Sequence, residues 1–371
     1  MVMDGSLGMA DELSADILVV GGGPAGCTAA KYAALNGAEV VLIERKKQIG
    51  VPFACGEFLP ESEEIKRIFP HVGEVESLFD FPKHLVSRRT DIIRLYSPHL
   101  KTYEIDFRGF TIDRDRFDQY LAIEASKAGA RIITGCTFIS MTADGAETSH
   151  GGIRAKIIIG ADGPLSSVAK SSGLPRNEVL YPAITSQANG QFEPVAEMYF
   201  GNIAPGGYAW ILPKRDGANV GVGIARRFSK SSLFEYLMNF ANRKKFNLNR
   251  RPRGKFVPMG GPLRPNFNER VLIVGDAAGH VMTVNGGGIP TAMICGRIAG
   301  EVASKVVLSG ESLSRYAREC KKHVEKPLRT ALVTKRLADL CWGNERSLEW
   351  AMRLLGRRRM ARIIRCRSLI P

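Results

Sequence analysis

Short apolar runs, each ending at a glycine-rich turn, recur at three places along this chain. The runs are residues 17–20, 157–159 and 271–274, and they consist almost entirely of Ile, Val and Leu. Such runs predict buried strands. The turns that follow them are residues 21–26, 160–163 and 275–279. One turn of this kind is weak evidence, but three in one chain are strong evidence for a dinucleotide site.

The first unit, residues 16–44, predicts a strand, a tight turn, a helix and a second strand that ends at Glu44. Gly21 permits the tight turn, Gly23 lets the backbone approach a pyrophosphate, and Gly26 lets the helix pack close to the strand. The helix N-terminus attracts the phosphates, and the Glu44 carboxylate accepts a hydrogen bond from a ribose hydroxyl. The predicted cofactor-binding residues of this unit are Gly21, Gly23, Ala25, Gly26, Glu44 and Arg45.

After Arg45 the chain leaves the regular strand–helix pattern that a nicotinamide dehydrogenase would continue. The turns at residues 162–163 and 275–276 resemble the second and third fingerprints of the para-hydroxybenzoate hydroxylase-like flavoproteins. This resemblance implies FAD as the cofactor, with Asp276 at the flavin ribityl chain and a helix that begins near residues 286–290. The further cofactor-binding residues that it implies are Asp162, Gly163, Gly275, Asp276, Gly287, Gly288 and Ile289.

Residues 111–118 resemble the strand-to-helix element of the same superfamily, whose arginine approaches the cofactor. Arg114 is the predicted cofactor-binding residue, and Arg116 is the weaker candidate. The alternative for both is a plain surface ion pair, which would have no role in binding.

Two further segments narrow the family. Residues 208–213, Tyr-Ala-Trp-Ile-Leu-Pro, are followed after seven residues by Gly-Val-Gly. They resemble the aromatic-x-Trp-x-Phe-Pro…Gly-x-Gly element of geranylgeranyl reductases, although Leu212 stands where phenylalanine is usual. Residues 52–57, Pro-Phe-Ala-Cys-Gly-Glu, are similar to a segment of the archaeal members, which reduce digeranylgeranylglycerophospholipids. The resemblance implies FAD-dependent saturation of the C=C bonds of geranylgeranyl chains.

The segment from residue 208 to residue 223 also reads as two short strands around a turn at residues 214–217. Alternate residues Tyr208, Trp210 and Leu212 then share one face, and flat apolar side chains suit a channel for an isoprenoid chain. The predicted substrate-binding residues are Tyr208, Trp210 and Pro213. Without the resemblance, Trp210 would be interpreted as ordinary core.

An isolated alkene has no carbonyl group to take up charge, so its reduction needs a proton at one carbon and a hydride from reduced flavin at the other. Cys55 and Glu57 are the predicted catalytic residues that handle this proton. Cys55 and Gly56 are also predicted to lie against the cofactor, because the glycine suggests a close backbone approach. The alternative for Cys55 is an inert residue that fills space in a loop.

Two other functions compete with the reductase. A flavin-dependent monooxygenase, a hydroxylase or epoxidase, would use the same cofactor fold. An electron carrier or quinone-linked dehydrogenase is the third, although no cysteine cluster suggests an iron–sulfur centre. The seven scattered cysteines contain no C-x-x-C pair, which predicts no metal site and a reducing, cytoplasmic location.

The predicted fold class is α/β, with a Rossmann-like FAD-binding domain interleaved with an antiparallel-sheet substrate domain and followed by a C-terminal helical segment. The FAD-binding domain is expected to consist of residues 14–80, 111–175 and 265–303. The substrate domain is expected to consist of residues 81–110 and 176–264. Residues 304–371 form the expected basic helical region, and no apolar run is long enough to span a membrane.

The formal charge of +15 is concentrated near the C-terminus, because residues 301–371 hold 17 Lys or Arg and 7 Asp or Glu. Seven arginines between residues 353 and 367 are interleaved with apolar residues, a pattern typical of a helix that lies on an anionic membrane. The equally supported alternative is a helix whose arginine stems cover the core. Nucleic acid is not expected, since no nucleic-acid motif accompanies the arginines. The expected partners are an isoprenoid lipid, the inner face of the cell membrane and an external electron donor, which stays open among NADPH, NADH and ferredoxin.

Overall fold

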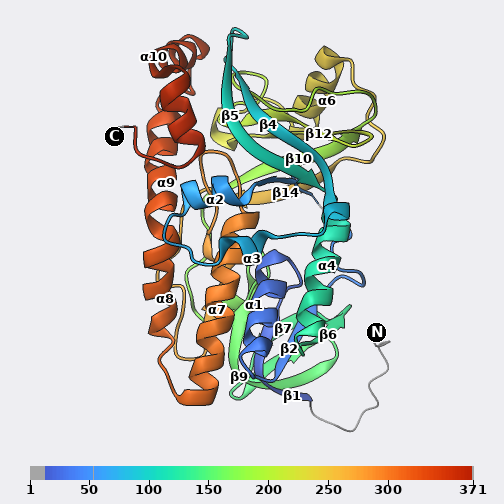
Figure 1. The fold of residues 1–371 in the computed structure, drawn as a ribbon, viewed down its shortest axis with the longest axis vertical. Helices are drawn as coiled ribbons and strands as arrows, with labels where there is room; N and C mark the ends of the chain where they lie inside the picture. Colours follow the sequence, from blue (N-terminus) through green and yellow to red (C-terminus); the bar gives the residue numbers. More distant parts are fainter. Residues whose placement is uncertain (1–12, 53, 370–371) are drawn as a thin grey trace.

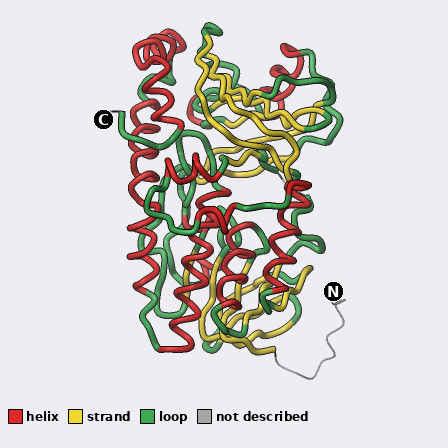
Figure 2. The backbone as a smooth tube through the Cα atoms, viewed as in Figure 1, coloured by secondary structure: helices red, strands yellow, loops and turns green. Residues whose placement is uncertain are grey.

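The computed structural model describes residues 13–52 and 54–369, which fold around two β-sheets (Figures 1 and 2). One sheet lies at the lower end of the molecule in these views and the other at the upper end. Four consecutive C-terminal helices, α7 to α10, run along one side and connect the two ends.

Seven strands of the described residues form the lower sheet, in the order β6-β2-β1-β9-β8-β7, with β15 beside β9. These are β1 (Leu13–Val20), β2 (Val40–Glu44), β6 (Arg131–Thr134), β7 (Phe138–Met141), β8 (Gly145–Thr148), β9 (Gly151–Gly160) and β15 (Val271–Ile273). The three predicted apolar runs are neighbours, because β9 pairs in parallel with both β1 and β15. The three glycine turns therefore leave the sheet at the same edge.

Helices α1 (Pro24–Leu35), α4 (Arg114–Lys127), α5 (Ser167–Ser171) and α7 (Ile289–Ser309) surround this sheet. Glycines let α7 approach α1 closely: a Cβ on Gly296 would lie 2.5 Å from the Ala25 carbonyl oxygen, and one on Gly300 would collide with that of Ala29. The predicted first unit and the predicted helix after residues 286–290 are both confirmed, as α1 and α7.

Eight strands form the upper sheet, in the order β14-β10-β13-β12-β11-β4-β5-β3. They are β3 (Phe58–Pro60), β4 (Val86–Tyr96), β5 (Thr102–Ile112), β10 (Leu180–Ala188), β11 (Val195–Tyr199), β12 (Tyr208–Lys214), β13 (Gly217–Gly223) and β14 (Arg253–Pro258). All pairs are antiparallel except β11 with β4. The predicted hairpin is confirmed as β12 and β13, with Lys214 opposite Gly217. The segment 14–80 assigned to the FAD-binding domain contains β3, which pairs with β5 in this upper sheet.

The remaining helices connect and cover the sheets. They are α2 (Ser62–Ile68), α3 (Val75–Phe79), α6 (Leu233–Lys244), α8 (Ser314–Cys320), α9 (Lys326–Asp339) and α10 (Glu345–Ile364), with a π-helical turn at Lys321–Glu325 and short 3-10 turns at Lys83–Leu85, Arg226–Phe228 and Gly275–Ala278. Helix α10 is kinked at Gly356, where φ is 61°. Among the described residues no helix combines the length and apolar character needed to cross a bilayer.

The arginine-rich end of the chain is docked on the molecule. Arg365 Nε lies 2.7 Å from Glu64 Oε2, and the guanidinium stacks on the Phe107 ring. Arg357 lies 2.6 Å from Asp106 of β5, and Arg367 donates to the Arg67 carbonyl at 2.8 Å. Several of the predicted membrane-binding arginines are therefore engaged within the chain, and the Arg365 guanidinium covers the buried Phe107 ring, a contact of the kind that the alternative interpretation expected.

Glu349 of α10 ties the helix to the turn between β4 and β5. Its carboxylate accepts a hydrogen bond from the backbone N–H of His99 and pairs with Arg353 at 2.6 Å. Burial acts to raise the pKa of Glu349, but Ser97, Arg353 and the His99 N–H outweigh burial and lower this pKa to about 2. The carboxylate is thus ionised throughout the neutral range, and it anchors α10.

Candidate active site

A cavity of about 1490 Å³ lies between the two sheets and extends to α9 and α10. Typical ligand pockets have volumes of about 300–1,000 Å³, so this cavity has room for a dinucleotide together with a second ligand. All three glycine turns line one part of it. Side chains of the upper sheet and of the C-terminal helices line the rest.

The first glycine turn has the features that a pyrophosphate requires. The Gly21 N–H donates to the Ile43 carbonyl, and the Gly22 N–H donates to Glu44 Oε2 at 2.8 Å. A Cβ on Gly26 would collide with the Gly21 carbonyl oxygen, whereas one on Gly23 would meet nothing within 4 Å. Gly26 therefore serves helix–strand packing, and Gly23 leaves open space in front of the N-terminus of α1.

The second and third turns line the same cavity. Asp162 accepts hydrogen bonds from the N–H groups of Ser167 and Val168, and so caps α5. Asp276 forms an ion pair with Lys255 Nζ at 2.7 Å. Gly287, Gly288 and Ile289 also line the cavity, at the N-terminus of α7. Gly275 does not line the cavity: it has a φ of 65°, and a Cβ there would lie 2.8 Å from that of Ala25.

Replacing Glu44 by alanine is expected to weaken FAD binding by about 1.5–3 kcal/mol, the usual range for hydrogen bonds to a charged group. The carboxylate holds the turn through Gly22 and also accepts from the Lys46 N–H at 2.9 Å. Flavin fluorescence titration of the apoprotein measures the change, with Glu39→Ala as an exposed control on the same unit. Unchanged FAD affinity in Glu44→Ala would contradict the assigned role.

Cys55 lies half-buried in the cavity wall, between the glycine turns and the upper sheet. Its Sγ accepts a hydrogen bond from the Glu57 N–H at 3.2 Å. Burial lowers the pKa of Arg114, but the charges of Asp118 and Cys55 outweigh burial and raise it. Asp276 and Cys55 likewise raise the pKa of Lys255 against the effect of burial. Arg114 and Lys255 therefore both lie close to Cys55 at the cavity wall.

Glu57 has no exposed surface, and all its partners are donors. Lys214 Nζ lies 3.0 Å from both carboxylate oxygens, and Asn219 Nδ2 and Gln187 Nε2 each lie 2.8 Å from Oε2. The Arg114 N–H donates to Oε1 at 3.1 Å. A carboxylate held by four donors from three parts of the chain is placed to fix its neighbours in position, and the proton-handling role of Glu57 stays a prediction.

The face predicted for substrate carries Tyr208, Trp210 and Leu212, and all three line the cavity. The Trp210 Nε1–H donates to Asn219 Oδ1 at 2.8 Å, which fixes the indole ring. Burial, and then the nearby Cys55, raise the pKa of Tyr208, whose hydroxyl donates to the Asn285 carbonyl. Pro213 does not line the cavity: it faces the other way, and its carbonyl accepts from the Thr111 hydroxyl at 2.6 Å.

Sequence reasoning placed Arg114 correctly at the cavity, where it pairs with Asp118 at 2.8 Å. The weaker candidate, Arg116, is exposed and does not line the cavity. Lys255 and Asn219, which lie beside Cys55 and Glu57, were not among the predicted site residues. The only signal for Asn219 is a polar residue within the apolar run 218–222, and Lys255 is one cation among many in a basic chain.

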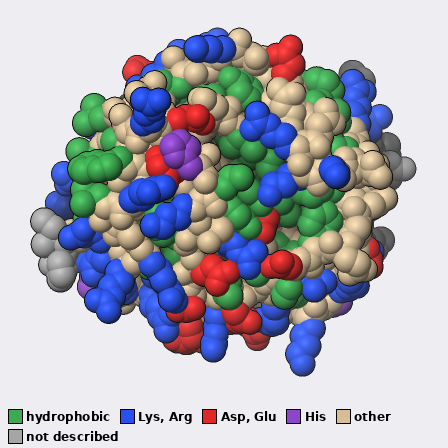
Figure 3. All heavy atoms as spheres, turned by 90° about the horizontal axis from the view of Figure 1, so that it is seen from above, with side chains coloured by type: hydrophobic (Ala, Val, Ile, Leu, Met, Phe, Trp, Pro, Cys, Tyr) green, Lys and Arg blue, Asp and Glu red, His purple; other side chains and the backbone are tan. Residues whose placement is uncertain are grey.

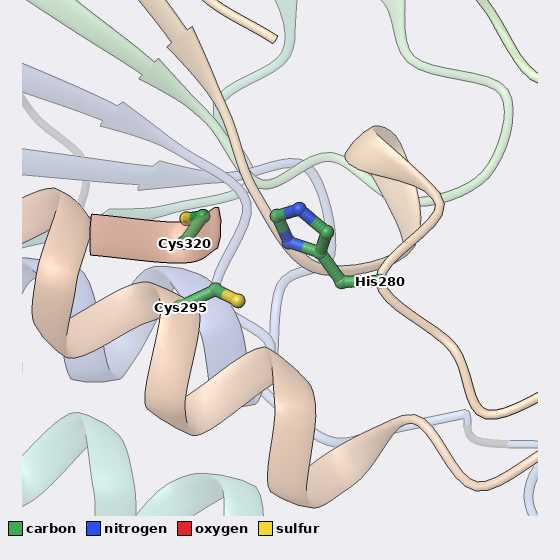
Figure 4. A group of neighbouring side chains, drawn as sticks. All are labelled: His280, Cys295 and Cys320. Atoms are coloured by element: carbon green, nitrogen blue, oxygen red, sulfur yellow. The ribbon is translucent and has the colours of Figure 1, made fainter. Parts of the chain in front are cut away.

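A buried cluster of His280, Cys295 and Cys320 lies beneath the third glycine turn (Figure 4), with one potential ligand atom from each within 4.8 Å of the others. Burial lowers the pKa of His280 to about 4 and raises the pKa of the Cys295 thiol. All three side chains are apart from the cavity lining. We interpret the cluster as neutral side chains packed in the core, with no part in the site.

Comparison with known proteins decides the family. Residues 183–261 match the family model of the geranylgeranyl reductase catalytic domain, and residues 16–51 match that of FAD dependent oxidoreductases. Digeranylgeranylglycerophospholipid reductase 1 of Methanothermobacter thermautotrophicus is 35% identical over 342 residues, 83% of each chain. The corresponding reductase of Methanocaldococcus jannaschii is 37% identical over 339 residues, 84% of this chain and 83% of that one. The chain belongs to the geranylgeranyl reductase family.

Solved structures agree with this membership. A geranylgeranyl bacteriochlorophyll reductase-like protein from Thermoplasma acidophilum has a TM-score of 0.81 at 27% identity, covering 92% of this chain and 91% of that one. The flavin-dependent brominase Bmp2 has a TM-score of 0.69 at 16% identity, covering 95% and 94% of the two chains, which shows a shared fold alone. With the match of residues 16–51 to FAD dependent oxidoreductases, this membership makes the chain an FAD-dependent oxidoreductase. The open space at Gly23 and the N-termini of α1 and α7 at one cavity fit that cofactor.

Proposed function

We propose that this enzyme saturates the C=C bonds of geranylgeranyl chains in archaeal digeranylgeranylglycerophospholipids. The observation that carries the proposal is one cavity that joins the flavin-binding turns to a long apolar lining. That lining includes Ile68, Ile93, Leu95, Phe107, Met198, Phe200, Trp342, Leu348, Met352, Met360, Ile363 and Ile364. It suits a flexible hydrocarbon chain, and the archaeal relatives are named for reduction of such lipids.

When bound and reduced by the external donor, FAD would supply the hydride for this reduction. The aromatic face of Tyr208 and Trp210 would orient the alkene, and the apolar walls would exclude water from it. Cys55 Sγ would donate the proton to the carbon that does not receive the hydride. Arg114 and Lys255 line the cavity beside it, and a proton from solvent would restore the thiol before the next reduction.

Glu57 enters the proposal as a positioning residue. It connects the Cys55 loop to Asn219 and Lys214 of the β12–β13 hairpin and to the first N–H of α4. This one buried carboxylate would therefore hold Cys55 and Trp210 in fixed relative positions. Cys55 alone would transfer the proton.

A monooxygenase of the same fold is the second candidate, because structures that share this fold include a probable FAD-dependent monooxygenase at 14% identity. Oxygen separates the two functions. The proposed reductase should convert its substrate without oxygen, whereas a monooxygenase should consume oxygen in step with NAD(P)H and insert an oxygen atom.

We propose that reducing equivalents come from an external donor and that the enzyme works at the surface of the membrane that holds its substrate. NADPH, NADH and reduced ferredoxin are the three candidate donors. Each is to be added separately to anaerobic holoenzyme, and the physiological class is the one that bleaches the flavin absorbance at a rate matching turnover.

Co-expression with a pathway that makes unsaturated archaeal lipids tests the proposed function in cells. Mass spectrometry of extracted lipids should show two added hydrogen atoms for each reduced double bond. Lipids that stay fully unsaturated, despite a flavin-loaded enzyme and a suitable donor, would contradict the proposal.

A further inference from the structure

Five exposed apolar side chains gather at the junction of α9 and α10. They are Val333, Leu337, Leu340, Trp350 and Leu354, called here the rim patch, with exposed fractions of 56%, 52%, 81%, 67% and 61%. Among the described residues, twelve large apolar side chains are at least 52% exposed, and five of them fall within residues 333–354. Scattered exposed apolar residues need no explanation, but a contiguous group indicates a binding surface.

Helical spacing groups the members of the rim patch into two sets, one on α9 and at its C-terminal end and one on α10. Val333, Leu337 and Leu340 are separated by four and three residues, and Trp350 and Leu354 by four, so each set lies on one helix face. Three of the five, Leu337, Trp350 and Leu354, also line the cavity. The patch therefore borders an opening of the cavity on the side of the C-terminal helices.

The surroundings of the rim patch are basic. Residues 326–359 contain nine Lys or Arg and three Asp or Glu. Figure 3 looks onto the end of the molecule that carries α10, and it shows exposed apolar side chains interspersed with many Lys and Arg side chains. Exposed apolar residues, including a tryptophan, on a segment with an excess of cations are the composition of a surface that lies on an anionic bilayer.

We propose that the rim patch docks on an anionic lipid bilayer and aligns the cavity opening with it. A lipid chain could then pass from the bilayer into the cavity along a continuous apolar path, without crossing water. The identity of that chain rests on the proposed function, whereas the docking itself does not. The docking surface is thus centred on the α9–α10 junction and not on the arginines near residue 365, which are engaged within the chain.

Vesicle binding by the FAD-loaded protein tests the proposal. The variant V333D/L340D changes the two patch members that do not line the cavity, and it should bind vesicles of phosphatidylcholine and phosphatidylglycerol at least tenfold more weakly. The matched control is L35D/L308D, because these leucines are 59% and 56% exposed and also lie near helix C-termini. The control should bind like the original protein.

Detergent-dispersed substrate separates this proposal from the proposed function. V333D/L340D should reduce that substrate at the original rate while reducing bilayer-embedded substrate at least tenfold more slowly. If neither the original protein nor V333D/L340D reduces dispersed substrate, the proposed function fails. The comparison of vesicle binding by the two proteins still tests the docking proposal in that case. Unchanged vesicle binding by V333D/L340D would overturn the docking proposal.

Tryptophan fluorescence gives a second test that needs no destabilising change. Vesicles containing brominated lipids should quench part of the tryptophan emission of the original protein. In W350F this quenched component should be absent, because it comes from Trp350. Equal quenching in the two proteins would show that Trp350 stays outside the bilayer and would overturn the proposal.

Discussion

The Glu57→Gln variant is expected to lose about 3–5 kcal/mol of free energy of unfolding, the usual result of breaking a buried ion pair. Among the described residues, Lys214 would keep Asp113, at 2.6 Å, as its carboxylate partner. The new amide NH2 would also face the NH2 groups that Asn219 and Gln187 now donate to Glu57, so a donor would meet a donor unless these amides turn over. Denaturant unfolding followed by circular dichroism measures the loss.

Glu61→Gln is the matched control, because Glu61 pairs with Arg89 at a site where that arginine is largely exposed. Its loss should be about 0–1 kcal/mol. Equal unfolding free energies for the Glu57→Gln variant and the original protein would contradict the positioning role of Glu57.

Cys55→Ala is expected to slow alkene reduction by about 10²–10⁴-fold, the usual contribution of a positioned acid. The thiol is half-buried at the cavity wall, and the fold does not depend on it for a salt bridge or a disulfide. FAD content and melting temperature should therefore stay near those of the original protein. Single-turnover reduction by the pre-reduced enzyme measures the rate without interference from the electron donor.

Cys341→Ala removes the other half-buried thiol, in the connection between α9 and α10. It should slow the reaction far less, because this thiol lies at the end of the cavity that is lined by the C-terminal helices and not at the glycine turns. If Cys55→Ala reduces alkenes at the original rate, Cys55 is a filler, and the proton must come from another group, such as a bound water.

The parts of the fold that sequence predicted are those set by local geometry. A glycine turn after an apolar run requires a backbone that few residues adopt, so the first unit and the start of α7 could be found without tertiary information. The β12–β13 hairpin follows from alternation around a short turn. Sequence motifs indicated Cys55 and Trp210 as site residues, although the two lie far apart in the sequence and line the same cavity only in the folded chain.

The missed features depend on partners distant in sequence. The partners of Glu57, Lys214 and Asn219, come from a hairpin more than 150 residues away. For the arginines of the tail, the sequence left a membrane surface and a core face equally supported, because nothing in it connects Arg365 to Glu64. Charge pairing across a fold leaves no periodic pattern, so these individual partners could not be predicted.

The central claim is that this cavity reduces isolated double bonds, and anaerobic turnover of a geranylgeranyl glycerophospholipid tests it most directly. Purified FAD-loaded enzyme, reduced with dithionite and kept free of oxygen, should give products whose masses increase by two hydrogen atoms for each double bond. Products that appear only when oxygen is admitted, and that carry an added oxygen atom, would contradict the account and establish a monooxygenase.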